Sequence, residues 1–179
     1  RDKAKGKEKM GAVRARQKAS VFIGTATCGR SAGALETLKV FSEELKGRNI
    51  DAEIVETGCL GLCYAEPVVA IAKLGRPTIW YRSVSPERAK ELIESYLYND
   101  NPLVDYALGT TGDGGVEGIP NLFDLPVLKS QVRRVLHNCG FIDPANINHY
   151  IATHGYQALR KALFEMSPEQ VIDEVKRSG

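Results

Sequence analysis

Two cysteines in a glycine-containing loop constrain this chain more than any other feature of its sequence. Cys59 and Cys63 lie in residues 57–69, TGCLGLCYAEPVV, between two apolar segments that are typical of strands. Three residues separate the two thiols, so the loop can turn back and direct both sulfurs at one point. Gly58 and Gly61 suit such a loop, because glycine adopts positive φ at little cost and lets the backbone approach an inorganic centre. The spacing predicts a metal-binding loop.

The residues before this loop predict a strand, a helix and a second strand. Residues 20–23 (SVFI) include β-branched and aromatic side chains, as in a buried strand. Residues 34–46 place leucine or phenylalanine every three or four positions, which indicates an amphipathic helix, and residues 52–56 alternate in polarity as a strand does. A crossover of this kind joins parallel strands and is right-handed.

A third cysteine, Cys28, follows the first predicted strand, in the segment TATCGRSAG at residues 25–33. The carboxyl ends of two neighbouring parallel strands lie at the same edge of a sheet. We therefore expect Cys28 to lie beside Cys59 and Cys63, although the helix separates them in the sequence.

The residues after the loop complete an α/β domain. Residues 68–72 and 78–81 are apolar and flank a short turn, which predicts an antiparallel hairpin. Ser85, a proline and a glutamate then begin an amphipathic helix that reaches Leu97. The order β-α-β-β-β-α predicts a thioredoxin-like domain at residues 19–98.

Length and composition limit the remaining choices. A chain of 179 residues, of which 43% are hydrophobic, can bury the core of one domain with a smaller attachment. It therefore needs no disulfides for stability, and reduced thiols at a metal are the better interpretation of its four cysteines. No apolar run approaches the ~20 residues of a membrane span, and no secretion signal is evident. We expect a soluble, cytoplasmic protein.

The first residues form a basic segment. Residues 1–18 hold eight lysine or arginine residues against two acidic ones, although the net charge of the whole chain is only +2. We interpret this segment as a flexible or loosely helical arm. A nucleic-acid-binding arm is the alternative, but no aromatic stacking residues or reading motif accompany it. Docking onto an acidic partner subunit lies between these two interpretations.

Residues 19–98 resemble a thioredoxin-like two-iron, two-sulfur (2Fe-2S) ferredoxin domain, and residues 57–69 are the specific part of that resemblance. This family normally uses four cysteines, two after the first strand and two in the Cys-x₃-Cys pair. The resemblance therefore implies a 2Fe-2S cluster with Cys28, Cys59 and Cys63 as metal ligands. No cysteine precedes Cys28, so three of the four ligands are present.

Other residues of the loops are candidates for contacts with the cluster. Backbone N–H groups of three glycines are candidates for hydrogen bonds to the sulfurs: Gly29, Gly58 and Gly61. An oxygen of Thr25 or Thr27 is a candidate for the fourth ligand position. We expect Cys139 to be a small buried hydrophobic residue rather than a ligand.

The same residues leave alternatives open. Three thiols with one further donor would also fit tetrahedral zinc. A redox disulfide between Cys59 and Cys63 is less favoured, since active dithiols are usually two residues apart. The domain could also have lost its cluster and kept the loop for packing, as a docking module without iron.

The sequence of the last part of the chain predicts a linker followed by a helical segment. Residues 99–125 contain too many glycines for a packed element and predict a tether. From residue 126 to 140 we expect a helix with Arg133 and Arg134 pointing outward and five apolar residues buried: Val127, Leu128, Val132, Val135 and Leu136. Further short helices follow, the last of them beginning at the capping-box sequence SPEQ.

Residues 126–179 resemble the lead-in to the flavin domain of the NADH-oxidising subunit of complex I. A ferredoxin-like domain in front of it is typical of soluble relatives such as bifurcating hydrogenases and NAD-linked formate dehydrogenases. The resemblance implies an electron-transfer module on the flavoprotein subunit of an oxidoreductase complex, with other subunits as partners. It also implies that the chain is a fragment without a complete catalytic site. FMN, NAD and a 4Fe-4S cluster are implied only for the full-length subunit.

Overall fold

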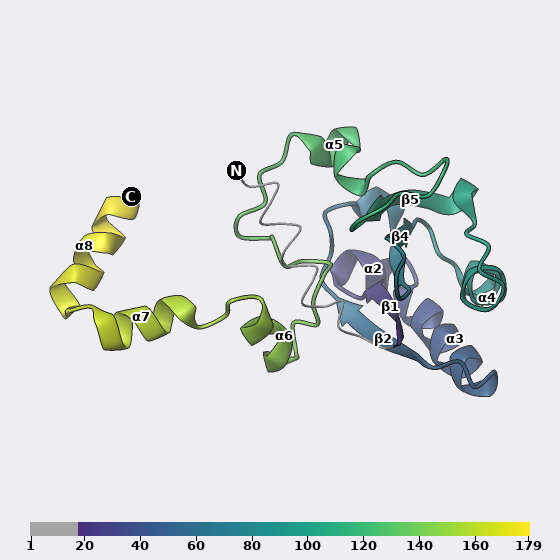
Figure 1. Ribbon diagram of the computed structural model, residues 1–179, viewed down its shortest axis with the longest axis horizontal. Coiled ribbons are helices and arrows are strands. Elements are labelled where there is room, and N and C mark those ends of the chain that lie inside the picture. The colour runs from purple at the N-terminus through teal and green to yellow at the C-terminus, as the bar shows by residue number, and fades with distance from the viewer. Residues whose placement is uncertain (1–17) are drawn as a thin grey trace. The chain divides into compact units, whose positions relative to one another are not determined.

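The computed structural model describes residues 18–179, so nearly all of the predicted basic arm (1–18) lies outside the described residues. A five-stranded sheet in the order β2-β1-β3-β4-β5 organises the part up to Pro144 (Figure 1). β1 pairs in parallel with β2, and the other neighbours are antiparallel. The strands are β1 (Ala19–Gly24), β2 (Ala52–Thr57), β3 (Val69–Ala72), β4 (Thr78–Tyr81) and β5 (Ala107–Thr111).

The crossover between β1 and β2 has the predicted form. It contains the short helix α2 (Thr27–Ser31) and the longer helix α3 (Ala34–Gly47). The parallel register pairs the last residue of β1, Gly24, with the last residue of β2, Thr57. The loops that carry the cysteines therefore leave the sheet from adjacent positions.

The two faces of the sheet carry separate cores, because successive side chains of a strand point to opposite faces. One core joins the sheet to α3 and to α4 (Pro86–Leu92), whose first turn is capped by Ser85 as predicted. The second core includes two leucines of the cysteine loop, Leu60 and Leu62, together with Phe22 and Trp80 of the sheet. Burial of these leucines holds the loop against the sheet.

The fifth strand corrects the interpretation of residues 99–125 as a tether. β5 lies within this segment and pairs with β4 in antiparallel fashion. Glycine is what allows the packing at position 109, since a Cβ atom there would lie 2.6 Å from Cα of Leu122. The glycine content that suggested a flexible segment instead permits a close approach of two backbone segments.

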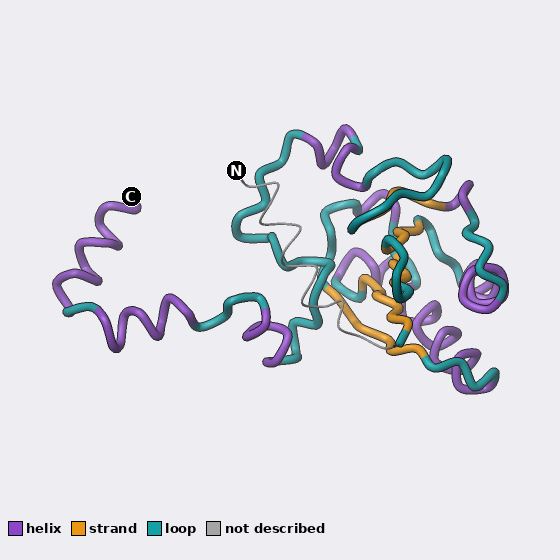
Figure 2. The backbone as a smooth tube through the Cα atoms, viewed as in Figure 1, coloured by secondary structure: helices purple, strands orange, loops and turns teal. Residues whose placement is uncertain are grey.

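The helix expected from residue 126 to 140 is also corrected. α5 spans only Pro126–Lys129, and the chain between it and α6 is mostly loop (Figure 2). Leu128 is buried as predicted, whereas the other four apolar residues are exposed: Val127, Val132, Val135 and Leu136. Arg133, expected to point outward, donates hydrogen bonds to the carbonyls of Leu136 and Cys139. These side-chain contacts stabilise a looped backbone in place of the helix.

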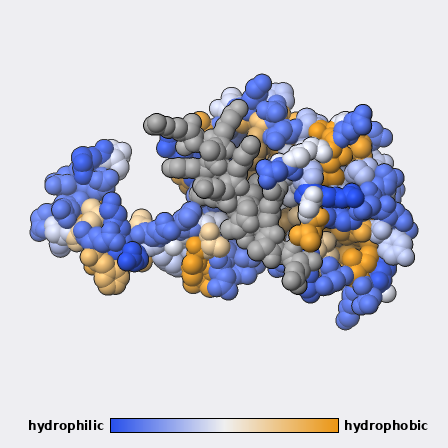
Figure 3. Space-filling model, viewed as in Figure 1, coloured by the Kyte–Doolittle hydropathy of each residue, from blue (hydrophilic) through white to orange (hydrophobic). Residues whose placement is uncertain are grey.

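Residues Ala145–Gly179 form a second compact unit. It consists of α6 (Ile147–Ala152), α7 (Gln157–Glu165) and α8 (Pro168–Ser178), and the predicted capping box at Ser167 and Gln170 is present. None of the side chains in these three helices is buried, and apolar residues are visible at the surface around α6 and α7 (Figure 3). No helix within residues 18–179 is long and apolar enough for a membrane span.

Candidate metal centre

The three cysteines singled out in the sequence lie together in the structure. Cys28 is on α2, Cys59 follows β2, and Cys63 begins a short 3-10 helix (Cys63–Ala65). The Sγ atoms of Cys28 and Cys63 are 3.3 Å apart, and those of Cys59 and Cys63 are 3.8 Å apart. All three sulfurs lie within 4.8 Å of one another.

Two of the predicted glycines have defined roles around these sulfurs. Gly61 adopts φ of 96°, and its N–H donates a hydrogen bond to Sγ of Cys59 over 3.2 Å. Gly29 lets α2 turn tightly against β1, because a Cβ atom at this position would lie 1.9 Å from the carbonyl oxygen of Gly24. The third, Gly58, borders Cys139, whose Sγ would lie 3.8 Å from a Cβ atom added to Gly58.

The surroundings of the thiols favour their neutral form when no cation is present. Burial raises the pKa of Cys59 to about 12, and the hydrogen bond from Gly61 opposes this effect. The pKa of Cys28 is raised by its hydrogen bond to Cys63 and by the charge of that thiol. Close, partly desolvated thiolates repel one another, and a bound cation would remove this repulsion.

Glu66 is a neighbour of these thiols to which the sequence analysis gave no role. It follows the 3-10 helix, precedes Pro67 with a cis peptide bond and is only 9% exposed. Its carboxylate accepts a hydrogen bond from the Val68 N–H at 2.7 Å. Burial raises the pKa of Glu66, while hydrogen bonds from Val68 and Cys59 lower it. The sequence signals for this position were that it follows Cys63 by three residues and lies within the segment 57–69 that carries the resemblance.

Arg133 and Cys139 also lie beside the cysteine loop. Nη1 of Arg133 donates a hydrogen bond to the Leu60 carbonyl at 2.8 Å, and Nη2 donates one to the Cys139 carbonyl at 3.0 Å. Cys139 is half-buried and lies outside the group of three close sulfurs. Arg133 therefore holds the segment that contains Cys139 against the cysteine loop, although the two are far apart in the sequence.

The two threonines considered for a fourth ligand differ in their environment. Thr25 is buried, and its N–H donates a hydrogen bond to the Thr57 carbonyl at 3.1 Å. Thr27 is exposed at the start of α2. No contact between a sulfur and either hydroxyl is described for residues 18–179, so a ligand role for them stays a prediction.

The spacing of the sulfurs fits metal coordination. Two thiolates bound at ~2.3 Å to one tetrahedral metal lie roughly 3.8 Å apart, which is the separation of Cys59 and Cys63. Three soft sulfur donors suit iron–sulfur clusters and zinc alike. The geometry of the thiols is therefore compatible with a 2Fe-2S cluster and by itself also with zinc.

Comparisons with known proteins show which proteins the chain resembles. No protein-family model matches the chain. A 2Fe-2S ferredoxin from Clostridium pasteurianum is 32% identical over 71 residues, which are 38% of this chain and 67% of that protein. Subunit HndC of the NADP-reducing hydrogenase of Solidesulfovibrio fructosivorans is 55% identical over 51 residues, and subunit HndB is 29% identical over 103 residues.

The relatives differ in how much of their length is matched. The HndB match covers 56% of this chain and 82% of HndB, whereas the HndC match covers 28% of this chain and 10% of HndC. The chain thus spans about a tenth of HndC. Among solved structures, the thioredoxin-like [2Fe-2S] ferredoxin from Aquifex aeolicus aligns with a TM-score of 0.45 at 23% identity, covering 52% of this chain and 99% of that one.

The predicted α/β thioredoxin-like fold is confirmed, with a fifth strand added to the expected four. The sequence similarity also extends over two thirds of an established ferredoxin. On this evidence, the chain belongs to the family of the Clostridium pasteurianum 2Fe-2S ferredoxin and is related to subunits of an NADP-reducing hydrogenase.

Proposed function

We propose that the chain is an electron-transfer domain that holds a 2Fe-2S cluster through Cys28, Cys59 and Cys63. The observation that carries this proposal is the convergence of the three sulfurs within 4.8 Å. The ferredoxin relatives and the hydrogenase subunits support iron–sulfur chemistry over zinc. When bound, such a cluster supplies a centre that takes up and releases one electron at a time.

The residues around the thiols would support this role. The N–H of Gly61 donates to Sγ of Cys59 and would stabilise negative charge on that sulfur. Gly29 and Gly58 are proposed to let the backbone come close to the cluster. Leu60 and Leu62 are buried and would exclude water from one side of the site. Cys63 is exposed, so this side of the centre would face an electron-transfer partner.

We further propose that the domain belongs to the flavoprotein subunit of a cytoplasmic, multi-subunit NAD(P)H-linked oxidoreductase. The similarity to HndB and HndC supports other subunits as partners. FMN, NAD and a 4Fe-4S cluster would belong to the full-length subunit, whose sequence would continue into a flavin domain. No nucleic-acid partner and no complete catalytic site are proposed for this chain.

The proposed domain layout follows from this assignment. Residues 1–18 would be a basic arm, residues 19–98 the ferredoxin domain, residues 99–125 a connection that contributes β5, and residues 126–179 the lead-in to a flavin-binding domain. The exposed apolar side chains of α6 to α8 support a packing role for the last part: Ile147, Ile151, Leu159, Leu163, Phe164, Ile172 and Val175.

The proposal is tested by purifying the full chain without exposure to air. We expect two irons and two acid-labile sulfides per chain, and an electron paramagnetic resonance signal after reduction with dithionite. Replacement of Cys28, Cys59 or Cys63 by serine should remove most of the iron, whereas Cys139→Ser should not. Iron near zero in protein that never met oxygen contradicts the proposal.

A docking domain without iron is the second candidate, and the presence of only three converging thiols favours it. For such a domain, the serine variants would bind partner subunits as the wild-type chain does, and metal analysis would find no iron. A zinc site would show one zinc per chain with no sulfide and no visible absorption.

A further inference from the structure

The three thiols leave the proposed cluster one protein ligand short. Two tetrahedral irons that share two sulfides need four ligands from the protein. Three are the sulfurs of Cys28, Cys59 and Cys63. A further donor near them must therefore be found in the chain or supplied by solvent.

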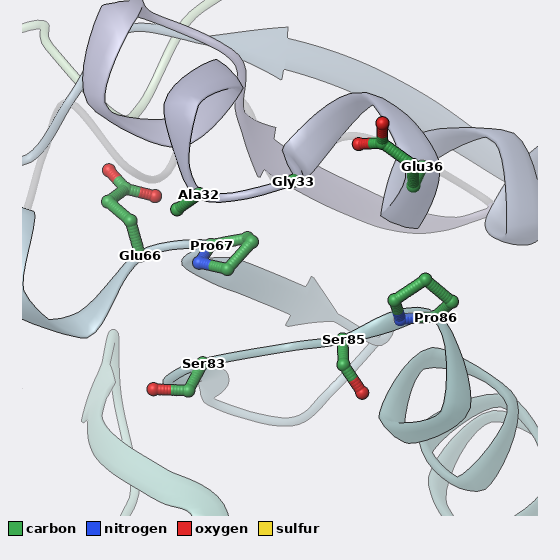
Figure 4. Close-up of a pocket in the computed structure, with 8 residues that line it drawn as sticks. All are labelled: Ala32, Gly33, Glu36, Glu66, Pro67, Ser83, Ser85 and Pro86. Carbon is green, nitrogen blue, oxygen red and sulfur yellow. The ribbon is translucent and has the colours of Figure 1, made fainter.

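Glu66 is the buried anionic group beside these sulfurs. It lines a small cavity together with Gly58 and Leu60, the two residues that flank Cys59 in the sequence. In the close-up of the neighbouring pocket, the carboxylate points away from Ser83 and Ser85 and toward α2 (Figure 4). α2 is the helix that carries Cys28.

The end of β1 leaves room for this carboxylate. Gly24 is the last residue of β1, and a Cβ atom there would lie 3.1 Å from Oε2 and 3.4 Å from Oε1 of Glu66. Any larger residue at position 24 would compete with the carboxylate for this space. The lack of a side chain at Gly24 therefore makes room for the buried Glu66 carboxylate.

We propose that the Glu66 carboxylate is the fourth protein ligand of the cluster, so that three thiolates and one carboxylate hold it. This inference rests on the proposed function. A two-iron cluster is longer than a single ion, so its fourth ligand need not lie within the 4.8 Å that encloses the three sulfurs. The set retains four singly charged anionic donors, as a four-thiolate set does.

The hydrogen bonds of Glu66 suit this role. Oε2 accepts from the Val68 N–H, which fixes the orientation of the carboxylate group. A carboxylate has two acceptor oxygens, so the second oxygen, Oε1, is available to a metal.

The other donors fit less well. The hydroxyls of Thr25 and Thr27 are neutral and would have to lose a proton to replace an anionic ligand. Cys139 is near the backbone of Gly58 and is outside the group of close sulfurs. The Cys139 thiol is the competing candidate for the fourth ligand, and the experiment must distinguish it from Glu66.

The test compares variants of the full chain purified without air, by iron and sulfide content and by Mössbauer and electron paramagnetic resonance spectra. Glu66→Gln retains the size of the side chain and the acceptor for Val68, and we expect it to lose most of its iron. Glu66→Cys should retain iron, shift the g values, and make the two iron sites more alike, because each would then carry two thiolates.

The following outcomes would contradict the proposal. Glu66→Gln with full iron content and unchanged spectra overturns the proposal. Loss of iron in Cys139→Ser, with Glu66→Gln unaffected, assigns the fourth position to Cys139 instead. Absence of iron in the wild-type chain contradicts the proposed function itself, and circular dichroism of each variant shows whether the fold is retained.

Discussion

Arg133 donates a hydrogen bond from Nη1 to the carbonyl oxygen of Leu60 over 2.8 Å, across 73 residues of sequence. The same guanidinium also binds the carbonyls of Leu136 and Cys139. Burial lowers the pKa of Arg133, while the nearby thiols of Cys139 and Cys59 act in the opposite direction. One cation therefore connects the segment after α5 to the loop that carries the cysteines.

We expect Arg133→Gln to reduce stability by about 1–3 kcal/mol, because the partly buried carbonyl groups of Leu60 and Cys139 lose their donor. Chemical denaturation followed by circular dichroism measures this change. If the cluster is bound, its reduction potential should also fall, since removal of a positive charge disfavours the more negative reduced state. Arg134→Gln, at an exposed neighbour, is the matched control. Equal stability of the two variants would contradict a role for the Arg133 contacts.

Gly29→Ala should disrupt the turn that carries Cys28. The added Cβ atom would lie 1.9 Å from the Gly24 carbonyl oxygen, so α2 would have to move. Such crowding costs about 1–3 kcal/mol or more, and the displacement of Cys28 should lower iron content as well. Gly47→Ala, at the end of α3 with no atom within 4 Å of the added Cβ, is the control and should leave stability unchanged or slightly higher. Similar thermal melts for both variants would argue against this close contact.

The stability of the domain should depend on the ionisation of Asp100. A hydrogen bond from Lys73, together with the charges of Lys73 and Arg76, lowers the pKa of Asp100 below its ordinary value. A carboxylate with a lowered pKa in the folded state stabilises the protein above its ordinary pKa of about 3.9, and this contribution is lost as pH falls through the folded-state value.

Asp100→Asn tests this dependence without changing the backbone, because asparagine tolerates the φ of 62° found at this position. The variant should be less stable than the wild type at pH 7, and the difference should shrink as pH falls below about 3.9 and vanish once pH is below the folded-state pKa of Asp100. Denaturant titrations at several pH values measure the difference. A constant difference across this range would contradict the assignment to Asp100. Asp124→Asn, at an exposed residue for which the structure describes no ion pair, is the control.

The start of α8 depends on Ser167. Its Oγ accepts a hydrogen bond from the Gln170 N–H, and the Gln170 side chain accepts one from the Ser167 N–H. Ser167→Ala should destabilise this helix by about 1 kcal/mol. Faster amide hydrogen exchange across α8 would show the loss, and Ser178→Ala, at the other end of the helix, should change it less. Unaltered exchange in Ser167→Ala would mean that packing, rather than the cap, determines this helix end.

Elements whose signals are local could be predicted from the amino-acid sequence. The periodicity of residues 34–46 predicted α3, the SPEQ sequence predicted the capping box of α8, and the strand–helix–strand order predicted a parallel β1/β2 pair. Since parallel strands end at the same edge of a sheet, this order also predicted that Cys28 would meet Cys59 and Cys63.

Features that depend on contacts between distant residues became visible only in the folded chain. β5 forms in a glycine-rich segment because Gly109 can approach Leu122, and residues 130–140 remain a loop because Arg133 bonds across to Leu60. The place of Glu66 depends likewise on the space left by Gly24, forty-two positions earlier in the chain. Local patterns determine helices and strands because their hydrogen bonds join near neighbours, whereas these contacts exist only once the chain has folded and so leave no periodic signal in the sequence.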